Sequence, residues 1–328
     1  MASPRVHRPS VCIITPYLAR ANNGNWHTAA RWARLLRPAF RVCIQQHWDG
    51  NRCDALIALH AGRSAASIHA FAREHPDRAL LVVLTGTDLY GKLDARTRRS
   101  LDLATRLVVL NELGGDPLPR QWREKCALLL PSATPLAPLA PRHRTFDVAV
   151  VGHLRAVKDP RLPMRIARRL PDTSKIRLLH AGEALERGWS RAARTTARST
   201  DHYRWLGGVP AAQARALIRR SRLLLHPSKD EGGATVIVEA LQSGTPVIAS
   251  DCDGNVGLLG RNYPGLFPVG DMDRAKFLLL QAENEPRFYR RLAAAAKQRA
   301  RLFTPAREGR TLRRLVHNSI KLNPPSPK

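Results

Sequence analysis

Two glutamates, Glu231 and Glu239, frame a glycine-containing segment in the second half of the chain. The surrounding residues predict a strand, a loop, a glycine-rich helix start and a helix. The free amides and positive dipole end of a helix start attract anions, and glycines let a ligand come close. Glu231 is expected just before the helix, and Glu239 about two turns further on and on roughly the same side. Such carboxylates can accept hydrogen bonds from the hydroxyls of a sugar and a ribose.

The same pair has a second explanation. A solvent-facing glutamate followed by a helix-capping glutamate would produce the same spacing. The two interpretations are equally good for the segment in isolation, so the rest of the chain has to decide between them.

A basic loop follows an earlier predicted strand. Residues 146–151 predict the strand, Gly152 to Lys158 the loop, and Pro160 the first turn of a helix. The guanidinium of Arg155 and the ammonium of Lys158, beside free helix amides, would form a receptor for a diphosphate. A plain surface pair is the alternative, but the glutamate segment downstream favours the receptor.

Short apolar runs alternate with helical spacings along the whole chain. The runs predict strands at residues 11–15, 55–59, 80–84, 107–110, 127–130, 146–151, 176–180, 203–206, 223–225 and 247–250. This alternation is typical of α/β proteins with parallel sheets and right-handed crossovers. Residues 131–141 hold four prolines in eleven positions, which predicts a stiff linker. We therefore predict two Rossmann-like parallel-sheet domains that face a cleft.

The predicted borders follow from this linker. They are an N-terminal domain at 1–135, the linker at 136–146, a C-terminal domain at 147–300, a helix at 301–320 that packs back towards the first domain, and a disordered tail at 321–328.

Polar residues fall at strand ends of the first domain, where parallel sheets bind ligands. They are His60, Arg63, Thr85, Thr87 and Asp88. Each is explained equally well as a cap or turn residue. The turn of residues 21–25, with Gly24 and Asn25, also follows a strand, but it lacks the GxGxxG fingerprint of dinucleotide-binding folds.

The composition limits the class of protein. With 328 residues and 44% hydrophobic content, the chain can form one large or two ordinary domains. No run approaches the ~18 to 20 apolar residues of a membrane span, and the start has no apolar signal core. The five scattered cysteines lack CxxC spacing. Neither a disulfide framework nor a metal site is therefore expected, and a reducing cytoplasm fits best.

The net charge of +28 favours anionic partners such as nucleotides, phosphates or an acidic membrane surface. The arginines are spread along the chain, and aromatic residues make up only 5%. Nucleic-acid readers combine basic charge with stacking aromatics or a known motif, so no specific nucleic-acid partner is expected.

The basic loop and the glutamate segment together resemble the GT-B glycosyltransferases of the GT4-like group. In that group a glycine-led basic loop precedes a Glu-x7-Glu element that runs into EA-x-x-x-G-x-P-V, here Glu239 to Val247. The resemblance implies a nucleotide-sugar donor held mainly by the second domain, an acceptor held mainly by the first, and no metal or other cofactor.

The resemblance also implies roles for single residues. Arg155 and Lys158 would neutralise the leaving diphosphate, Glu231 would contact the sugar, and Glu239 would bind the ribose. The further donor-side residues are Gly24, Asn25, Gly152, His153, Leu206, Gly207, Gly232 and Gly233. Among them, Gly24 and Asn25 would close over the diphosphate from the first domain.

Two positions depart from the group. The group usually has an arginine directly after the loop glycine, where this chain has His153; Arg155, two positions on, would substitute for it. The group often has a histidine at the start of an H-G-T-D-like turn, where this chain has Thr85. Deprotonating a hydroxyl benefits from a base, so this loss indicates an acceptor that is already a nucleophile. His60 remains a candidate base, or else a cap or a buried neutral histidine.

A narrower set of segments is similar to the selenosugar synthases of selenoneine biosynthesis. They are residues 85–90, 152–160, 230–234, 256–260 and 263–265. This resemblance implies a UDP-sugar donor (UDP-N-acetylglucosamine or UDP-glucose), selenophosphate as acceptor, a 1-seleno sugar as product, and other enzymes of that pathway as partners. Selenophosphate is an anionic, soft nucleophile that needs no general base. Its candidate contacts are Arg63, His153 and Arg155.

Two other functions stay open. One is an ordinary glycosyltransferase that acts on a lipid or glycan at an anionic membrane surface, although no convincing basic amphipathic helix supports it. The other is a basic binding protein with a GT-B scaffold that has lost its catalytic activity, and the intact basic loop and glutamates argue against it.

Overall fold

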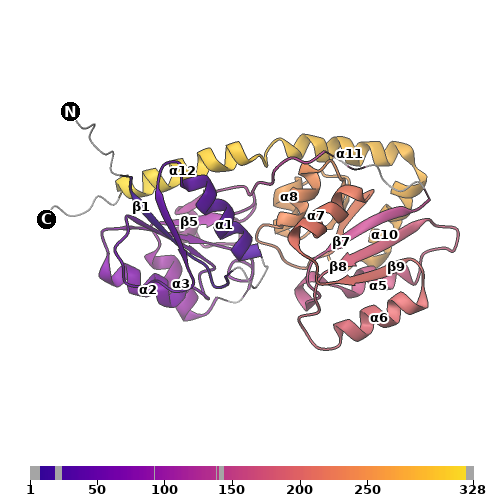
Figure 1. Ribbon diagram of the computed structural model, residues 1–328, viewed down its shortest axis with the longest axis horizontal. Coiled ribbons are helices and arrows are strands. Elements are labelled where there is room, and N and C mark those ends of the chain that lie inside the picture. The colour runs from indigo at the N-terminus through magenta and orange to yellow at the C-terminus, as the bar shows by residue number, and fades with distance from the viewer. Residues whose placement is uncertain (1–7, 19–23, 92, 138, 140–143, 323–328) are drawn as a thin grey trace. The chain divides into compact units, whose positions relative to one another are not determined.

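The computed structural model describes residues 8–18, 24–91, 93–137, 139 and 144–322. The chain divides into two compact units, of which unit 1 holds residues 1–131 and 305–328 and unit 2 holds residues 132–304. Each unit is built on its own six-stranded parallel sheet (Figure 1). This confirms the predicted α/β class with two parallel-sheet domains.

The sheet of unit 1 has the strand order β2-β1-β3-β4-β5-β6, with every neighbouring pair parallel. The strands are β1 (Ser10–Ile14), β2 (Arg41–Gln45), β3 (Ala55–Leu59), β4 (Ala79–Val83), β5 (Arg106–Val109) and β6 (Cys126–Leu128). Strands β3 and β4 are fully buried. The sequence did not predict β2, because this edge strand has only exposed and half-buried residues and no apolar run.

The helices of unit 1 cover both faces of its sheet (Figure 1). They are α1 (Gly24–Leu36), α2 (Ala65–Glu74), α3 (Ala95–Leu103), α4 (Arg120–Arg123) and α12 (Pro305–Leu322). Alternate residues of β1 enter different cores: Ile13 joins the cluster with α1 and α12, and Ile14 the cluster with α2 and α3. Period-two alternation in a strand produces this division.

Helix α12 is fixed to unit 1 by a buried carboxylate. Glu308 is 2% exposed and accepts hydrogen bonds from the indole of Trp32 at 2.7 Å and from Nε of Arg31 at 2.9 Å. Leu312 and Val316 of the same helix lie in the core. The helix continues to Leu322, past the start of the tail expected from residue 321, and residues 323–328 of that tail lie outside the described part.

The sheet of unit 2 has the order β12-β11-β10-β7-β8-β9 and is also parallel throughout. The strands are β7 (Phe146–Val151), β8 (Ile176–Ala181), β9 (Tyr203–Gly207), β10 (Leu223–His226), β11 (Val247–Ser250) and β12 (Leu266–Phe267). The central β10 and β11 are buried along their whole length, as expected for apolar runs in a parallel sheet.

Unit 2 carries seven α-helices and one 3-10 turn within its described residues. They are η2 (Ala156–Lys158), α5 (Arg161–Ala167), α6 (Trp189–Ser199), α7 (Ala211–Arg220), α8 (Thr235–Gln242), α9 (Asp253–Leu259), α10 (Met272–Asn284) and α11 (Pro286–Ala300). Helix α8 packs against both α7 and α11, and α5 packs against α10. The sequence did not predict α9, because glycines at 254 and 257 lower its helix propensity.

The described part of the proline-rich linker lies along unit 2. The amide of Leu136 donates to the carbonyl of Gln242 at 3.1 Å, and that of Leu139 to the carbonyl of Arg219 at 3.1 Å. Residues 138 and 140–143 of the predicted linker lie outside the described residues. The last predicted linker residue, Phe146, is the first residue of β7.

Among the described residues, no helix is both long and apolar enough to cross a membrane. In the same part of the chain, no three histidine, cysteine, aspartate or glutamate side chains are grouped to hold a metal ion.

Candidate functional site

The central crevice of unit 2 lies between β7 and β10. From β7 the chain proceeds to β8 and β9 on one side, whereas from β10 it proceeds to β11 and β12 on the other. The loops after β7 and β10 therefore leave the carboxyl edge of the sheet in opposite directions. Such a switch point is where doubly wound parallel sheets bind ligands. The basic loop and the loop of Glu231 are the two loops that flank it.

Glu231 lies in the loop and not in the helix. Helix α8 begins at Thr235, so four residues from Glu231 to its N-cap Ala234 are not helical, and Glu239 is the fifth residue of the helix. The prediction that Glu239 lies about two helical turns beyond Glu231 and on roughly the same side assumed a continuous helix between them, so it does not apply. What positions Glu231 is the end of β10, together with its side-chain contacts.

One carboxylate oxygen of Glu231 has two donors. Its Oε1 accepts hydrogen bonds from Nζ of Lys158 and from Nε2 of His226, the latter at 2.9 Å. No side chain or amide of the described residues donates to Oε2. The Glu231 side chain is 9% exposed and that of Lys158 is 30% exposed. The site thus contains a held carboxylate with one oxygen left for a ligand hydroxyl.

The charge of Glu231 is set by these contacts. Burial by itself raises the pKa of this carboxyl, but the Lys158 ammonium and the hydrogen bond from His226 outweigh burial. The pKa of Glu231 is thereby held far below its usual range, and the side chain is ionised at neutral pH.

A close backbone approach fixes the loop of Glu231. A Cβ atom added to Gly254, in the first turn of α9, would lie 1.7 Å from the carbonyl oxygen of Glu231. The next residue, Asn255, is fully buried and donates to the carbonyl of Ser250 at 3.0 Å, while the Ser250 hydroxyl donates to the carbonyl of Ser228. Helix α9 therefore supports the loop from below, and only glycine fits at the point of contact.

The basic loop is held by backbone contacts on two sides. The carbonyl of Val157 accepts a hydrogen bond from the amide of Lys229 at 2.8 Å, which ties this loop to the one after β10. The amide of Ala156 donates to Glu186 Oε2 at 2.9 Å, and the Trp189 indole donates to the same oxygen at 3.1 Å. These contacts place Lys158 at the end of the 3-10 turn, within reach of Glu231.

Two predicted residues of this loop differ in their contacts. Nδ1 of His153 accepts the amide proton of Glu183 at 3.2 Å, so this nitrogen is occupied within the protein. No hydrogen bond or ion pair joins the guanidinium of Arg155 to the described residues, although its charge acts on the exposed carboxylate of Glu186, so its donors can still reach an anion. Gly152 lies against Gly182, where an added Cβ would be 1.9 Å from the Gly152 carbonyl oxygen.

The other predicted donor residues of unit 2 are spread along the same edge of its sheet. Gly232 is buried and Gly233 half-buried, between Glu231 and α8. Leu206 and Gly207 end β9, which β8 separates from β7. Glu239 is one helical turn into α8, and its carboxylate lies 3.9 Å from Nε of Arg215 on α7.

Sequence reasoning missed three contributors to this site: His226, Gly254 and Arg215. His226 follows an apolar run and precedes Pro227 and Ser228, and a buried histidine there resembles any strand end. Gly254 belongs to the helix that was not predicted. Arg215 is one of many arginines, and only the packing of α7 on α8 brings it to Glu239.

In unit 1, the predicted acceptor-side residues form one cluster. The carboxylate of Asp88 is buried and accepts the amide protons of Thr85 and Ala61, both at 2.8 Å. Nε2 of His60 lies 3.0 Å from Thr87 Oγ1, and its Nδ1 lies 3.6 Å from Asp88 Oδ2. Asp88 thus caps the turn, as in the alternative explanation that it is a cap or turn residue. His60 lies beside this turn, which has Thr85 where the GT4-like group often has a histidine.

Two further features surround this cluster. His60 has a positive φ of 71°, an uncommon conformation for a residue other than glycine. The Arg63 guanidinium donates to the Tyr17 hydroxyl and lies 5.3 Å from the centre of its ring. Gly24 and Asn25 are the first residues of α1, and the preceding turn at 21–23 lies outside the described residues.

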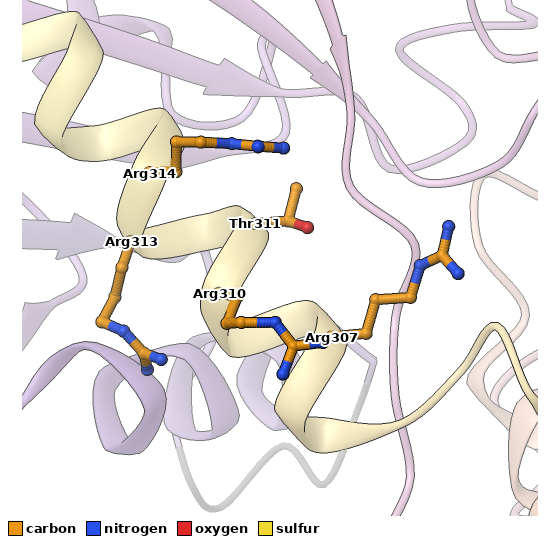
Figure 2. A pocket seen from close by; sticks show the side chains of 5 residues that line it. All are labelled: Arg307, Arg310, Thr311, Arg313 and Arg314. Carbon is orange, nitrogen blue, oxygen red and sulfur yellow. The ribbon is translucent and has the colours of Figure 1, made fainter.

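A separate hollow of about 390 Å³ lies on α12, as Figure 2 shows. It is lined by Arg307, Arg310, Thr311, Arg313 and Arg314. None of these residues belongs to the clusters described above.

Comparisons with known proteins agree with this architecture. Residues 137–299 match the family model described as glycosyl transferases group 1. A curated relative, glycosyltransferase 1 domain-containing protein 1 of Xenopus tropicalis, is 27% identical over 160 residues, which cover 48% of this chain and 45% of that protein. The chain thus matches less than half the length of this relative.

Solved structures match over nearly the whole chain. Anabaena HepE, in complex with UDP and glucose, has a TM-score of 0.73 at 13% identity and covers 96% of this chain and 100% of its own. The sucrose-phosphate synthase of Thermosynechococcus elongatus has a TM-score of 0.77 at 15% identity with the same coverage. At these identities the likeness establishes the fold. The chain therefore has the GT-B fold, and its segment 137–299 matches the model of the group 1 glycosyl transferases.

Proposed function

We propose that the protein is a glycosyltransferase that uses a UDP-sugar, either UDP-N-acetylglucosamine or UDP-glucose. The observation that carries this proposal is the pairing of Lys158 and Glu231 across the switch point of unit 2, with Oε2 of Glu231 left for a ligand. The structural neighbour HepE, which is described in complex with UDP-glucose, supports the choice of donor.

The chemical roles follow from charge. Arg155 and Lys158 stabilise the negative charge that develops on the diphosphate as the bond to the sugar breaks. Glu231 accepts a hydrogen bond from a sugar hydroxyl through Oε2, and the amides around Gly232 and Gly233 surround the sugar. Glu239 accepts hydrogen bonds from the ribose, with Arg215 as its neighbour. No residue in this scheme needs a metal.

For the acceptor we propose selenophosphate. The selenium forms a bond to C1 of the sugar as the C1–O bond to UDP breaks, and UDP leaves with the electron pair. Water then cleaves the P–Se bond, which releases phosphate and a 1-seleno sugar. This acceptor needs no base, which fits Thr85 at the position where the GT4-like group often has a histidine. Its support is the set of sequence segments shared with the selenosugar synthases.

A hydroxyl acceptor on a lipid or glycan is the second candidate, and His60 favours it. The imidazole lies beside the turn that starts at Thr85, with the Asp88 carboxylate 3.6 Å from Nδ1. Because Nδ1 accepts the amide proton of Arg63 at 3.3 Å, the ring proton lies on Nε2 in this structure, so His60 has to change tautomer before Nε2 can take the proton of a hydroxyl.

One assay separates the candidates. Purified protein is incubated with each UDP-sugar and either selenophosphate, no acceptor, or anionic vesicles that carry a lipid alcohol. UDP release and the masses of the sugar products are followed. UDP release that requires selenophosphate and yields a selenosugar supports selenophosphate as the acceptor. UDP release at the same rate with and without selenophosphate refutes it. His60→Asn should leave the selenophosphate reaction nearly unchanged and abolish transfer to a hydroxyl.

A further inference from the structure

The two donors to Oε1 of Glu231 differ in how firmly they are held. We propose that His226 is a positioning residue: it keeps the Glu231 carboxylate in place while Lys158 moves from Glu231 to the diphosphate of the incoming donor. This inference rests on the proposed function, because it assigns a step to the binding of the UDP-sugar in that site.

His226 is the fixed partner. It is the last residue of β10, it is 2% exposed, and its backbone is in register with Ala249 of β11. Its Nε2 carries the proton, since it donates to an ionised carboxylate at 2.9 Å, and the Ser228 hydroxyl lies 3.2 Å from the same nitrogen. A short side chain on a buried central strand has little freedom to move.

Lys158 is the mobile partner. Its ammonium sits on a flexible four-carbon stem, its side chain is 30% exposed, and it extends from a 3-10 turn at the surface of the loop. A diphosphate bound beside the basic loop would offer it more negative charge than one carboxylate does. Lys158 can therefore exchange partners without any change in the backbone.

The exchange requires that Glu231 remain satisfied. A buried carboxylate that loses its only partner is strongly destabilised. Because His226 already donates to the same oxygen, the carboxylate keeps one hydrogen bond after Lys158 leaves. The contact between Gly254 and the Glu231 backbone prevents the loop from relaxing away from His226.

The charged and titratable groups around Glu231 come from three segments. Lys158 lies on the basic loop, Asp230 directly precedes Glu231 in the chain, and Cys252 precedes α9. Burial raises the pKa of the Cys252 thiol to about 11, to which the charges of Glu231 and Asp230 contribute. Cys252 is therefore neutral at working pH. Among the described side chains, only Lys158 and His226 donate to Glu231, so a substitution of His226 removes one of two donors.

UDP affinity tests the exchange directly, because UDP contains the diphosphate and lacks the sugar. In His226→Phe, Lys158 must leave Glu231 without a replacement donor, so UDP should bind about tenfold more weakly by calorimetry. His226→Gln keeps an amide donor and should bind UDP nearly as well as the wild type. In the double variant His226→Phe with Glu231→Gln, the charge that retained Lys158 is absent, and UDP affinity should recover.

A second readout is the pH dependence of turnover. The pKa of Glu231 lies below its usual value, so activity that depends on its ionised form is lost only at low pH. Removing the His226 donor raises this pKa, and the acid limb of kcat/KM for the UDP-sugar should move to higher pH. A loss of packing alone would lower the melting temperature without moving that limb.

The matched control is His202→Phe. His202 is half-buried in the same unit, and its Nδ1 is bonded to the carbonyl of Ile176 at 2.8 Å, at the start of β8 and away from the carboxyl edge. It should leave UDP affinity and the acid limb unchanged. If the wild type binds UDP and His226→Phe binds it with the same affinity, this inference alone is overturned. Strictly additive effects of the two substitutions in the double variant would overturn it as well. If His226→Phe does not fold, Glu231→Gln must still bind UDP at least as tightly as the wild type. Absence of UDP binding to the wild type would overturn the proposed function as well.

Discussion

The two units place comparable polar residues at the carboxyl ends of their sheets, but they use them differently. In unit 2 the ionised Glu231 is held by one side chain of the basic loop and one at the end of β10, and among the described residues its other oxygen has no donor. In unit 1 both oxygens of Asp88 accept backbone amides, which stabilises the turn itself. A carboxylate committed to the backbone builds the fold, whereas one with a remaining acceptor can bind a ligand. Under the proposed function, this difference assigns donor binding to unit 2 and makes His60 and Arg63 the candidate acceptor residues of unit 1.

The largest effect is expected for Lys158→Ala. This change removes the cation that stabilises the leaving diphosphate, so kcat should fall on the order of 10² or more, measured as UDP release. Lys276→Ala on α10, where the ammonium lies 3.5 Å from Asp273, is the control and should keep the wild-type rate. A wild-type rate in Lys158→Ala would remove the functional difference between the units.

Glu239→Ala should weaken the binding of UDP and of the UDP-sugar by a similar factor, about tenfold, because both ligands contain the ribose. Glu231→Ala should instead weaken the UDP-sugar more than UDP. Calorimetry with both ligands measures this difference. Glu124→Ala, an exposed glutamate paired with Arg120 in unit 1, provides the control. Unchanged donor affinity in Glu239→Ala would refute its ribose role and leave Glu239 as a partner of Arg215.

Asp88→Ala probes unit 1. The change leaves the amides of Thr85 and Ala61 without their acceptor, at a cost of about 1–3 kcal/mol each in the free energy of unfolding. The melting temperature should therefore fall by several degrees, while UDP affinity stays at the wild-type value. A stable variant that has lost turnover would assign Asp88 to the chemistry and contradict the contrast drawn between the two carboxylates.

The smallest effect concerns the thiols. The hydrogen bond with Cys12 lowers the pKa of Cys43 to about 7, whereas burial raises the pKa of Cys53 to about 12 and that of Cys252 to about 11. Cys43 of unit 1 should therefore react first with iodoacetamide at pH 8, because the thiolate is the nucleophile. Peptide mapping by mass spectrometry identifies the labelled residue, and Cys43→Ser should remove the fast phase without changing UDP release. Rapid labelling of Cys252 would show that the loop around Glu231 opens.

Several features of the site could be predicted from local sequence. The apolar run before His226 and the glycines after Glu231 located the strand and loop, and Gly152 to Lys158 located the basic loop. The start of α8 was predicted too early, because Gly232 and Gly233 do not begin the helix and its first helical residue is Thr235. The strand β2 and the helix α9 escaped detection, since one lacks an apolar run and the other contains glycines.

The sequence by itself determined the alternation of strands and helices, the division into two sheets and the residue types of the basic loop and the glutamate segment, because apolar periodicity and turn residues act over a few positions. Only the tertiary structure decided which of these residues meet. Lys158 and Glu231 are 73 positions apart and come together because β7 and β10 are neighbours in the sheet. The same strand order places His226 under the carboxylate and Gly254 against its backbone. Contacts of this kind depend on strand order and close packing, which no local pattern of residues encodes.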